Sequence, residues 1–151
     1  MEIAIKALSP GINDPGTACI CIDYLTDLFV LWNGVRHSDV YYDDSHSPRL
    51  IVKSLSFETL FNICIGPIQR YGKEDLLVAN KLLQSFQTLS YFDRKDEHYK
   101  RLLNEHAVSV IEDIKNSSSN DSDLRFLHAR ILEMNQAPKG YFSLPSILSS
   151  C

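Results

Sequence analysis

The stretch from residue 9 to residue 32, SPGINDPGTACICIDYLTDLFVLW, determines how the chain is expected to fold. Pro10 and Gly11 are typical of a turn that ends a preceding helix. Asp14 and Pro15 match an N-cap followed by the first helical position. Proline is tolerated at that position because an N–H there would have no partner within the helix. Apolar residues then recur at helical spacing, at Ala18, Ile22, Leu25, Phe29 and Trp32. The pattern predicts a short helix before the turn and a longer one from about residue 15 to residue 32.

The chain after residue 55 is expected to be helical. Ser56 is a candidate N-cap for a third helix, and Gly66-Pro67 should kink that helix or end it early. Apolar stripes predict a fourth helix over about residues 73–91 and a last one over about residues 121–134. Between these two, a fifth helix is expected to follow a cap at Asp93.

A different pattern separates the second and third predicted helices. β-branched and aromatic runs flank a polar stretch there and predict a β-hairpin near residues 39–53. The predicted fold class is therefore all-α, a bundle of about five to six helices with one small β-hairpin. Residues 1–134 are expected to form a single helical domain, because 151 residues bury enough surface for one core. Residues 135–151 form an apolar C-terminal tail, which should be buried on its own domain or on a neighbour.

The composition and charge exclude several classes of protein. Hydrophobic residues make up 44% and charged residues 23% of the sequence, which is ordinary for a globular protein and unlike a disordered or fibrous one. With 15 Lys and Arg against 19 Asp and Glu, the net charge is −4. No nucleic-acid partner is expected, because that affinity comes mainly from neutralising phosphates. The cysteines are Cys19, Cys21, Cys64 and Cys151, without a Cys-x-x-Cys motif, so we expect buried free thiols in a reducing compartment and no cofactor.

The sequence also lacks the usual signals for membrane insertion and export. No stretch is expected to reach the roughly 18–20 apolar residues of a transmembrane helix. No basic segment precedes an apolar one, as it would in a signal peptide. The opening residues 2–8 have a helical pattern without a capping residue. We therefore expect the sequence to enter a longer helix partway along its length.

The turn before the long helix is one candidate site. Its side chains Ser9, Asn13, Asp14 and Thr17 surround an exposed helix N-terminus, where free N–H groups and oxygens could hold an ion or a small ligand. The same residue types also cap helices and turn the chain without any ligand. From these residues alone, capping is the favoured interpretation, and ligand binding or catalysis is the alternative.

Histidines provide the other candidates. His37, Asp43 and His46 combine imidazole with carboxylate, which suits a transition metal. A polar hairpin tip does not promise rigid ligands, so we expect a solvated tip and no metal. His106 and His128 lie on or beside apolar stripes, where a packed, hydrogen-bonded histidine is more common than a base or ligand. No catalytic constellation is evident, so no catalytic residue is assigned and the domain is expected not to be an enzyme.

A long motif resembles a known family. The run from Ala7 to Pro15 reads ALSPGINDP, and Thr17-Ala18 and Cys21-Ile22-Asp23 follow it. This string closely resembles the signature of a bacterial family of predicted membrane proteins of unknown function, DUF2254. Segments farther along the chain agree with the family, and the resemblance covers roughly residues 2–134.

The resemblance implies a soluble extramembrane region of a longer protein that begins with several membrane helices. It implies a bacterial inner-membrane protein, with this region on the cytoplasmic side, and it transfers no activity or catalytic residue. The leading hypothesis is a helical module for assembly, sensing or gating, with its own N-terminal membrane region as a partner. The alternative is a small-ligand-binding or enzymatic domain that uses the Ser9–Thr17 turn. We also expect a homodimer, with the opening helix or the C-terminal tail in the interface.

Overall fold

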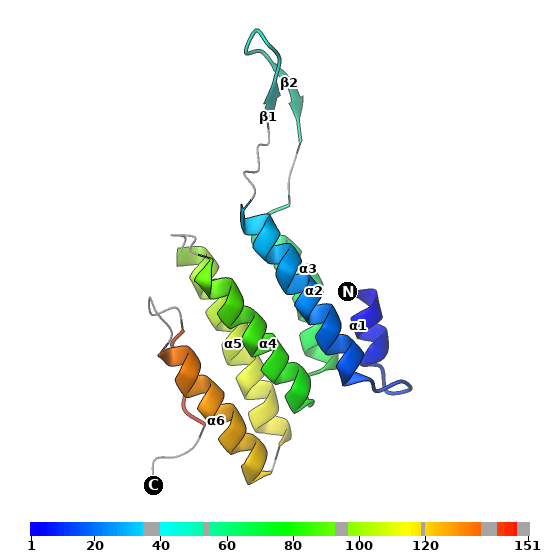
Figure 1. Ribbon diagram of the computed structural model, residues 1–151, viewed down its shortest axis with the longest axis vertical. Helices are drawn as coiled ribbons and strands as arrows, with labels where there is room; N and C mark the ends of the chain where they lie inside the picture. Colours follow the sequence, from blue (N-terminus) through cyan, green and yellow to red (C-terminus); the bar gives the residue numbers. More distant parts are fainter. Residues whose placement is uncertain (35–39, 53–54, 93–96, 119, 137–141, 148–151) are drawn as a thin grey trace.

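The computed structural model describes residues 1–34, 40–52, 55–92, 97–118, 120–136 and 142–147. Within these residues the chain forms six helices and one two-stranded antiparallel sheet (Figure 1). The helices are α1 (Glu2–Ala7), α2 (Pro15–Gly34), α3 (Phe57–Tyr71), α4 (Leu76–Tyr91), α5 (Glu97–Ser117) and α6 (Asp121–Asn135). The strands are β1 (Val40–Tyr42) and β2 (Pro48–Ile51). This arrangement confirms the predicted fold class, a helical bundle with one small β-hairpin.

The central helix of the bundle is α4, which packs against α2, α5 and α6 (Figure 1). Its buried side chains lie around most of its circumference and include Leu82, Leu83, Phe86 and Leu89, each at most 1% exposed. Each fully buried side chain of this size stabilises the fold by about 1.5–3 kcal/mol. One hydrophobic cluster contains residues from all six helices, α1 to α6. α1 joins this cluster by packing on α2.

An aromatic cluster joins three helices in the core. The ring centroid of Phe61 on α3 lies 5.3 Å from that of Phe29 on α2 and 5.7 Å from that of Phe86 on α4. Phe57, one turn earlier on α3, stacks on Phe61 at 5.4 Å. Such pairs contribute roughly 0.5–1.5 kcal/mol each beyond the area that they bury. Phe61 is fully buried and therefore fixes how α2, α3 and α4 meet.

Side-chain caps set where α3 and α4 begin. Ser56 caps α3 as predicted, since its hydroxyl oxygen accepts the N–H of Thr59 at 3.1 Å. The fourth helix begins after Asp75 and not near residue 73, because the Asp75 carboxylate accepts the N–H of Val78 at 3.0 Å. The predicted cap at Asp93 lies outside the described residues.

The third helix is continuous through Gly66 and Pro67, so the prediction of an early break was wrong. Proline has no N–H for the carbonyl of Ile63, and its ring clashes with the Cβ of a helical residue before it. Gly66 has no Cβ, which removes that clash. Ile65 and Ile68, on either side of the pair, are fully buried. Their packing holds the helix against the core although the hydrogen bond to the carbonyl of Ile63 is missing.

The hairpin projects from the bundle beyond the C-terminal end of α2 (Figure 1). Val40 pairs with Ile51 and Tyr41 with Leu50 in antiparallel register, within the predicted residues 39–53. Tyr41 is 54% exposed and Ile51 is 75% exposed. The hairpin therefore adds nothing to the core, and a two-stranded ribbon of this kind is marginally stable by itself in water.

Part of the C-terminal tail packs on its own bundle. Phe142 and Leu144 are 4% and 6% exposed, and both belong to the hydrophobic cluster. The Asn135 side chain at the end of α6 accepts the N–H of Leu144 at 2.8 Å and donates to its carbonyl at 3.1 Å. Tyr141 and Leu148 lie outside the described residues. The division into a domain over 1–134 and a tail over 135–151 stays a prediction.

The second helix is longer and more apolar than the sequence pattern suggested. α2 has 20 residues with a mean hydropathy of 1.2, enough by length and composition to cross a membrane. The expectation that no stretch reaches this length was therefore wrong. In the bundle 28% of that stretch is buried, and core helices of soluble proteins meet the same criterion.

Replacing Pro67 should stabilise the protein, because alanine supplies an N–H for the carbonyl of Ile63. We expect Pro67→Ala to raise the free energy of unfolding in urea by about 1–3 kcal/mol. Gly66→Ala should destabilise the natural chain but stabilise the Pro67→Ala chain by about 0.5–1 kcal/mol, since a Cβ fits only without the proline ring. An effect of the same sign in both backgrounds would contradict this explanation.

Candidate functional site

The predicted turn is a capping motif between α1 and α2. Asp14 accepts the hydroxyl of Thr17 at 2.6 Å with one carboxylate oxygen and the backbone N–H of Thr17 at 3.0 Å with the other. These two hydrogen bonds lower the pKa of Asp14 below its usual value of 3.8, and the bond from the Thr17 hydroxyl contributes more than the bond from the N–H. The Ser9 hydroxyl donates to the carbonyl of Lys6 at 2.7 Å, and Asn13 has a left-handed φ of 47°.

The structure therefore brings two of the four predicted turn residues together. Asp14 and Thr17 bond each other, whereas the Ser9 hydroxyl bonds α1 and Asn13 is exposed. No histidine is among the hydrogen-bond partners of these side chains in the described part of the chain. This geometry favours the capping interpretation over a ligand-binding turn.

The hairpin tip uses its carboxylate locally. Asp43 accepts the N–H of Ser45 at 2.9 Å and the Nε–H of Arg49 at 2.7 Å. The Ser45 hydroxyl, 2.6 Å away, contributes most to lowering the pKa of Asp43 to about 2. His46 occupies the turn with a φ of 60°, and His37 lies outside the described residues. Across the described ranges, no three His, Cys, Asp or Glu side chains come close enough to hold a metal.

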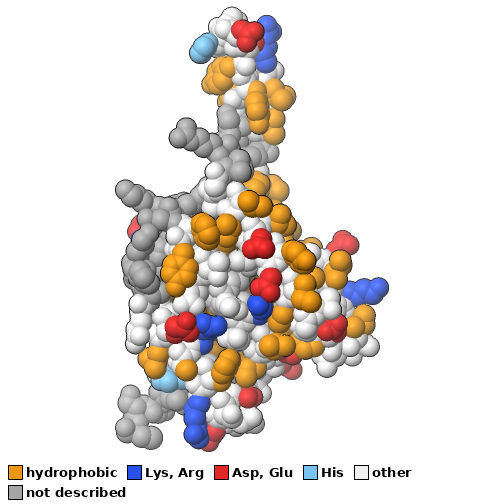
Figure 2. Space-filling view, viewed as in Figure 1, with side chains coloured by type: hydrophobic (Ala, Val, Ile, Leu, Met, Phe, Trp, Pro, Cys, Tyr) orange, Lys and Arg blue, Asp and Glu red, His pale blue; other side chains and the backbone are white. Residues whose placement is uncertain are grey.

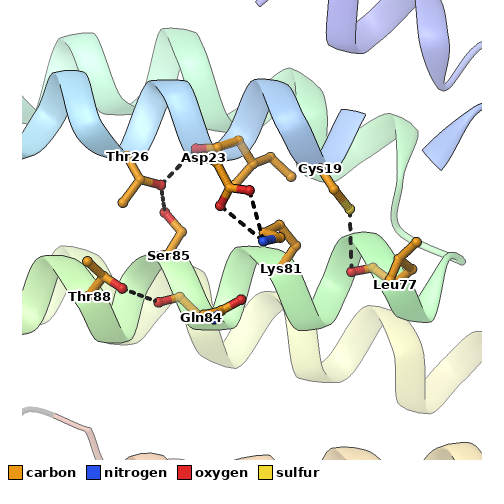
Figure 3. A network of polar contacts seen from close by, with 9 residues as sticks. Cys19, Asp23, Thr26, Leu77, Lys81, Gln84, Ser85 and Thr88 are labelled. Carbon is orange, nitrogen blue, oxygen red and sulfur yellow. Dashed lines mark hydrogen bonds and ion pairs between the residues drawn. The ribbon is translucent and has the colours of Figure 1, made fainter. Parts of the chain in front are cut away.

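Figure 3 shows the polar contacts that fix α2 against α4. Lys81 donates to both carboxylate oxygens of Asp23, at 3.0 and 2.9 Å. The Thr26 hydroxyl donates to the carbonyl of Ile22 at 2.7 Å, so Ser85, 2.6 Å away, donates to Thr26. The buried hydroxyls are thus paired, and this seam holds the two helices in register.

The three cysteines in the described part of the chain are free thiols on α2 and α3. Cys19 is buried at the α2–α4 seam, where its thiol lies 3.8 Å from the carbonyl oxygen of Leu77 (Figure 3). Burial raises the pKa of the Cys19 thiol. Cys21 and Cys64 are half-buried free thiols, and Cys151 lies outside the described residues. The expectation of buried free thiols is confirmed for Cys19, whereas Cys21 and Cys64 are free but only half-buried.

A polar groove between α3 and α5 is the feature that sequence reasoning missed. Its volume is about 450 Å³. The residues that line it recur every three or four positions, at 62, 66, 69 and 73 on one side and at 102, 106, 109 and 113 on the other. This spacing marks one face of each helix in the sequence. Which two faces would meet depends on how the helices pack.

His106 is one of the residues that line this groove. Its ring packs edge-on against Phe61, with centroids 5.1 Å apart. Nδ1 lies 3.1 Å from Oε1 of Gln69, and Nε2 lies 2.8 Å from Oδ1 of Asn62. Burial lowers the pKa of His106, against a smaller opposing effect of the Glu105 charge. The structure confirms the prediction of a packed, hydrogen-bonded His106.

Gln69 fixes the orientation of this network. Its side chain is buried, and its amide nitrogen donates to the Ser109 hydroxyl at 2.8 Å and lies 3.5 Å from a carboxylate oxygen of Asp113. The amide oxygen of Gln69 therefore faces His106 as an acceptor. His128 on α6 differs, because its buried Nδ1 has no hydrogen-bond partner among the described residues.

An apolar surface covers the outer side of α2 and the adjoining part of α3. Its α2 side chains are between 56% and 69% exposed at helical spacing: Ile20, Tyr24, Leu28 and Leu31. A groove of about 380 Å³ continues this surface between the two helices, with Leu60 and Cys64 on the α3 side. Figure 2 shows hydrophobic side chains along α2 and below the hairpin. We call these six residues the α2–α3 apolar surface.

Comparison with known proteins identifies the class to which this helical fold belongs. A family profile described as "Predicted membrane protein (DUF2254)" matches residues 1–88, more than half of the chain. The match runs from α1 into α4 and includes the capped turn. The chain therefore belongs to this family of predicted membrane proteins, as the motif resemblance predicted.

Individual relatives are uncharacterised. The chain is similar to the uncharacterized proteins Rv1290c of Mycobacterium tuberculosis and Mb1321c of Mycobacterium bovis, with 34% identity over 85 residues in each case. The alignment covers 56% of this chain and 16% of each relative. The chain thus matches only a small part of these longer proteins. No solved structure matches it significantly.

Removing the cap at the turn should destabilise the fold in a pH-dependent way. The pKa of Asp14 is lower in the folded state, so its stabilisation is present above its unfolded pKa and is lost as the pH falls through the folded pKa. We expect Asp14→Ala to lower the melting temperature near neutral pH and to have little effect well below the usual value of 3.8. Asp44→Ala, at the exposed hairpin tip, is the control. An equal loss at both pH values, measured by circular dichroism, would contradict this role.

Acidification should destabilise the fold through His106. Its pKa is lowered in the folded state, so the unfolded chain binds the proton more readily as the pH falls through 6.5. We expect His106→Gln to flatten the rise in the free energy of unfolding with pH across this range. An unchanged slope in His106→Gln would show that burial of this ring does not control the effect.

Proposed function

We propose that this chain is an extramembrane helical domain of a bacterial inner-membrane protein that serves assembly. The partner of its α2–α3 apolar surface is a second copy of the chain. The observation that carries this proposal is the exposed row of large apolar side chains on α2. Contiguous exposed apolar side chains usually mark an interaction site. Assembly, more directly than sensing or gating, uses such a surface.

The polar residues of α2 support a position outside the lipid. Asp23 and Asp27 lie in the middle of this helix and are exposed, and Lys81 pairs only with the first of them in the described ion pairs. A charge at the centre of a lipid-embedded helix costs about 2.5–3.5 kcal/mol or more. The free thiols favour the cytoplasmic side of the membrane, because a reducing compartment keeps cysteines unpaired.

The spacing of the exposed row supports a second copy as the partner. Two antiparallel α2 helices related by a two-fold axis would place Tyr24 opposite Leu28 and Ile20 opposite Leu31. The row is therefore complementary to itself, as a two-fold interface requires. Asp27 borders this row, because it lies about 20° around the helix from Ile20 and about 40° from Leu31.

Placing a charge on this row should abolish the dimer. We expect the purified chain to have twice its 17.2 kDa mass by light scattering at tens of micromolar, and Leu28→Glu to be a monomer with native circular dichroism. Leu132→Glu on α6, where the leucine is 47% exposed, is the matched control and should remain dimeric.

Three results would overturn the proposal. The first is a wild-type monomer, and the second is a dimer that survives Leu28→Glu. The third is a monomer that binds lipid vesicles through the same row, which would make lipid the occupant. Deleting residues 136–151 tests the tail separately. Because Phe142 and Leu144 belong to the core, only loss of the dimer with native circular dichroism would place the interface in the tail.

A further inference from the structure

We propose that the groove between α3 and α5 binds the head group of a free α-amino acid. The carboxylate of the ligand lies at Lys73, and its ammonium lies at Asp113. This inference concerns a different surface from the one proposed for assembly, so either proposal can fail while the other stands.

The first observation is a pair of opposite charges that face one space without closing on each other. Lys73 follows α3 and Asp113 lies on α5, and both line the same end of the groove. They also share a smaller adjoining hollow with Gly72. Within the described chain, the ion pair of Lys73 is with its exposed neighbour Glu74 at 3.9 Å, and none within 4.0 Å joins it to Asp113. The Lys73 ammonium and the Asp113 carboxylate therefore both face the groove without forming an ion pair with each other.

The sign pattern selects the class of ligand. A simple anion would be attracted by Lys73 but repelled by Asp113. A simple amine would be attracted by Asp113 but repelled by Lys73. An α-amino acid carries its ammonium and carboxylate on one carbon, so both charges can be met at one end of the groove. Arg70, which also lines the groove and has no ion pair among the described residues, adds a second positive charge on the α3 side.

The rest of the groove is suited to a polar side chain. Beyond Lys73 and Asp113, the walls present the Ser109 hydroxyl, the His106 imidazole and the Asn62 amide. The groove is also lined by the Glu58 and Glu105 carboxylates, which pair with His98 and Arg101. The hydroxyl, imidazole and amide groups are already oriented, because Gln69 is held by Ser109 at 2.8 Å and His106 is held by Gln69 at 3.1 Å. A pre-oriented set of donors and acceptors binds with less loss of side-chain entropy. A ligand with a hydroxyl or amide in its side chain fits this lining better than an aliphatic one.

Gly66 keeps the middle of the groove open. It lies between Asn62 and Gln69 on the groove side of α3, and nothing outside its immediate chain neighbours lies within 4 Å of where a Cβ would sit. A longer side chain at this position would project into the ligand space. This observation provides a blocking variant, Gly66→Leu, made in the Pro67→Ala chain because that background can accommodate a Cβ.

The experiment is a thermal-shift screen with each proteinogenic L-amino acid at millimolar concentration, followed by calorimetry of those that bind. A ligand that binds the folded state alone raises the melting temperature. We expect at least one amino acid with a polar side chain to bind, and its des-amino acid and decarboxylated amine to bind about tenfold more weakly. Lys73→Gln and Asp113→Asn should each weaken binding by a similar factor.

Matched variants separate a site from a general charge effect. Lys115→Gln and Glu112→Gln change exposed charges on α5 that do not line the groove, and they should leave binding unchanged. Gly66→Leu/Pro67→Ala should abolish binding, whereas Pro67→Ala alone should retain it. The proposal is overturned if no amino acid binds, if the des-amino acid binds equally well, or if the blocked groove binds as tightly as the open one.

Discussion

The burial of α4 on several faces constrains the positions of the other helices. Ser85 lies on one of these buried faces, and its hydroxyl needs a partner, which Thr26 of α2 supplies at 2.6 Å. With this contact and the Asp23–Lys81 pair in place, the register of α2 on α4 is fixed. The apolar residues of α2 that face none of α1, α3 and α4 are then left outside. The exposed row therefore follows from the seam, because a helix can turn only one face to its neighbour.

The polar groove depends on the same packing and on the continuity of α3. Asn62 and Gln69 lie on opposite sides of the Gly66–Pro67 pair, and both bond His106. A break at the proline would change the rotation of one half of α3 relative to the other, and only one of these amides would then face the ring. Glycine before the proline preserves the helix, and the missing side chain also leaves space in the groove.

The family match and the groove overlap only in part. The profile ends at residue 88, within α4, so it includes α3 but not α5. His106, Ser109 and Asp113 lie beyond that limit. The groove thus combines one wall from the matched region with one wall from the part of the chain that the profile does not cover. The properties proposed for the groove therefore concern this chain and are not carried over from its relatives.

The sequence by itself determined the features that depend on neighbouring residues. The caps at Asp14 and Ser56, the helical stripes and the position of the hairpin each depend on residues close together in the sequence, so they could be predicted from it. Tertiary packing decided the rest. It kept α3 intact through Pro67 and brought His106 between two amides of another helix. A stripe shows that a residue lies on one face of a helix, but only the packed bundle determines which neighbour, if any, that face meets.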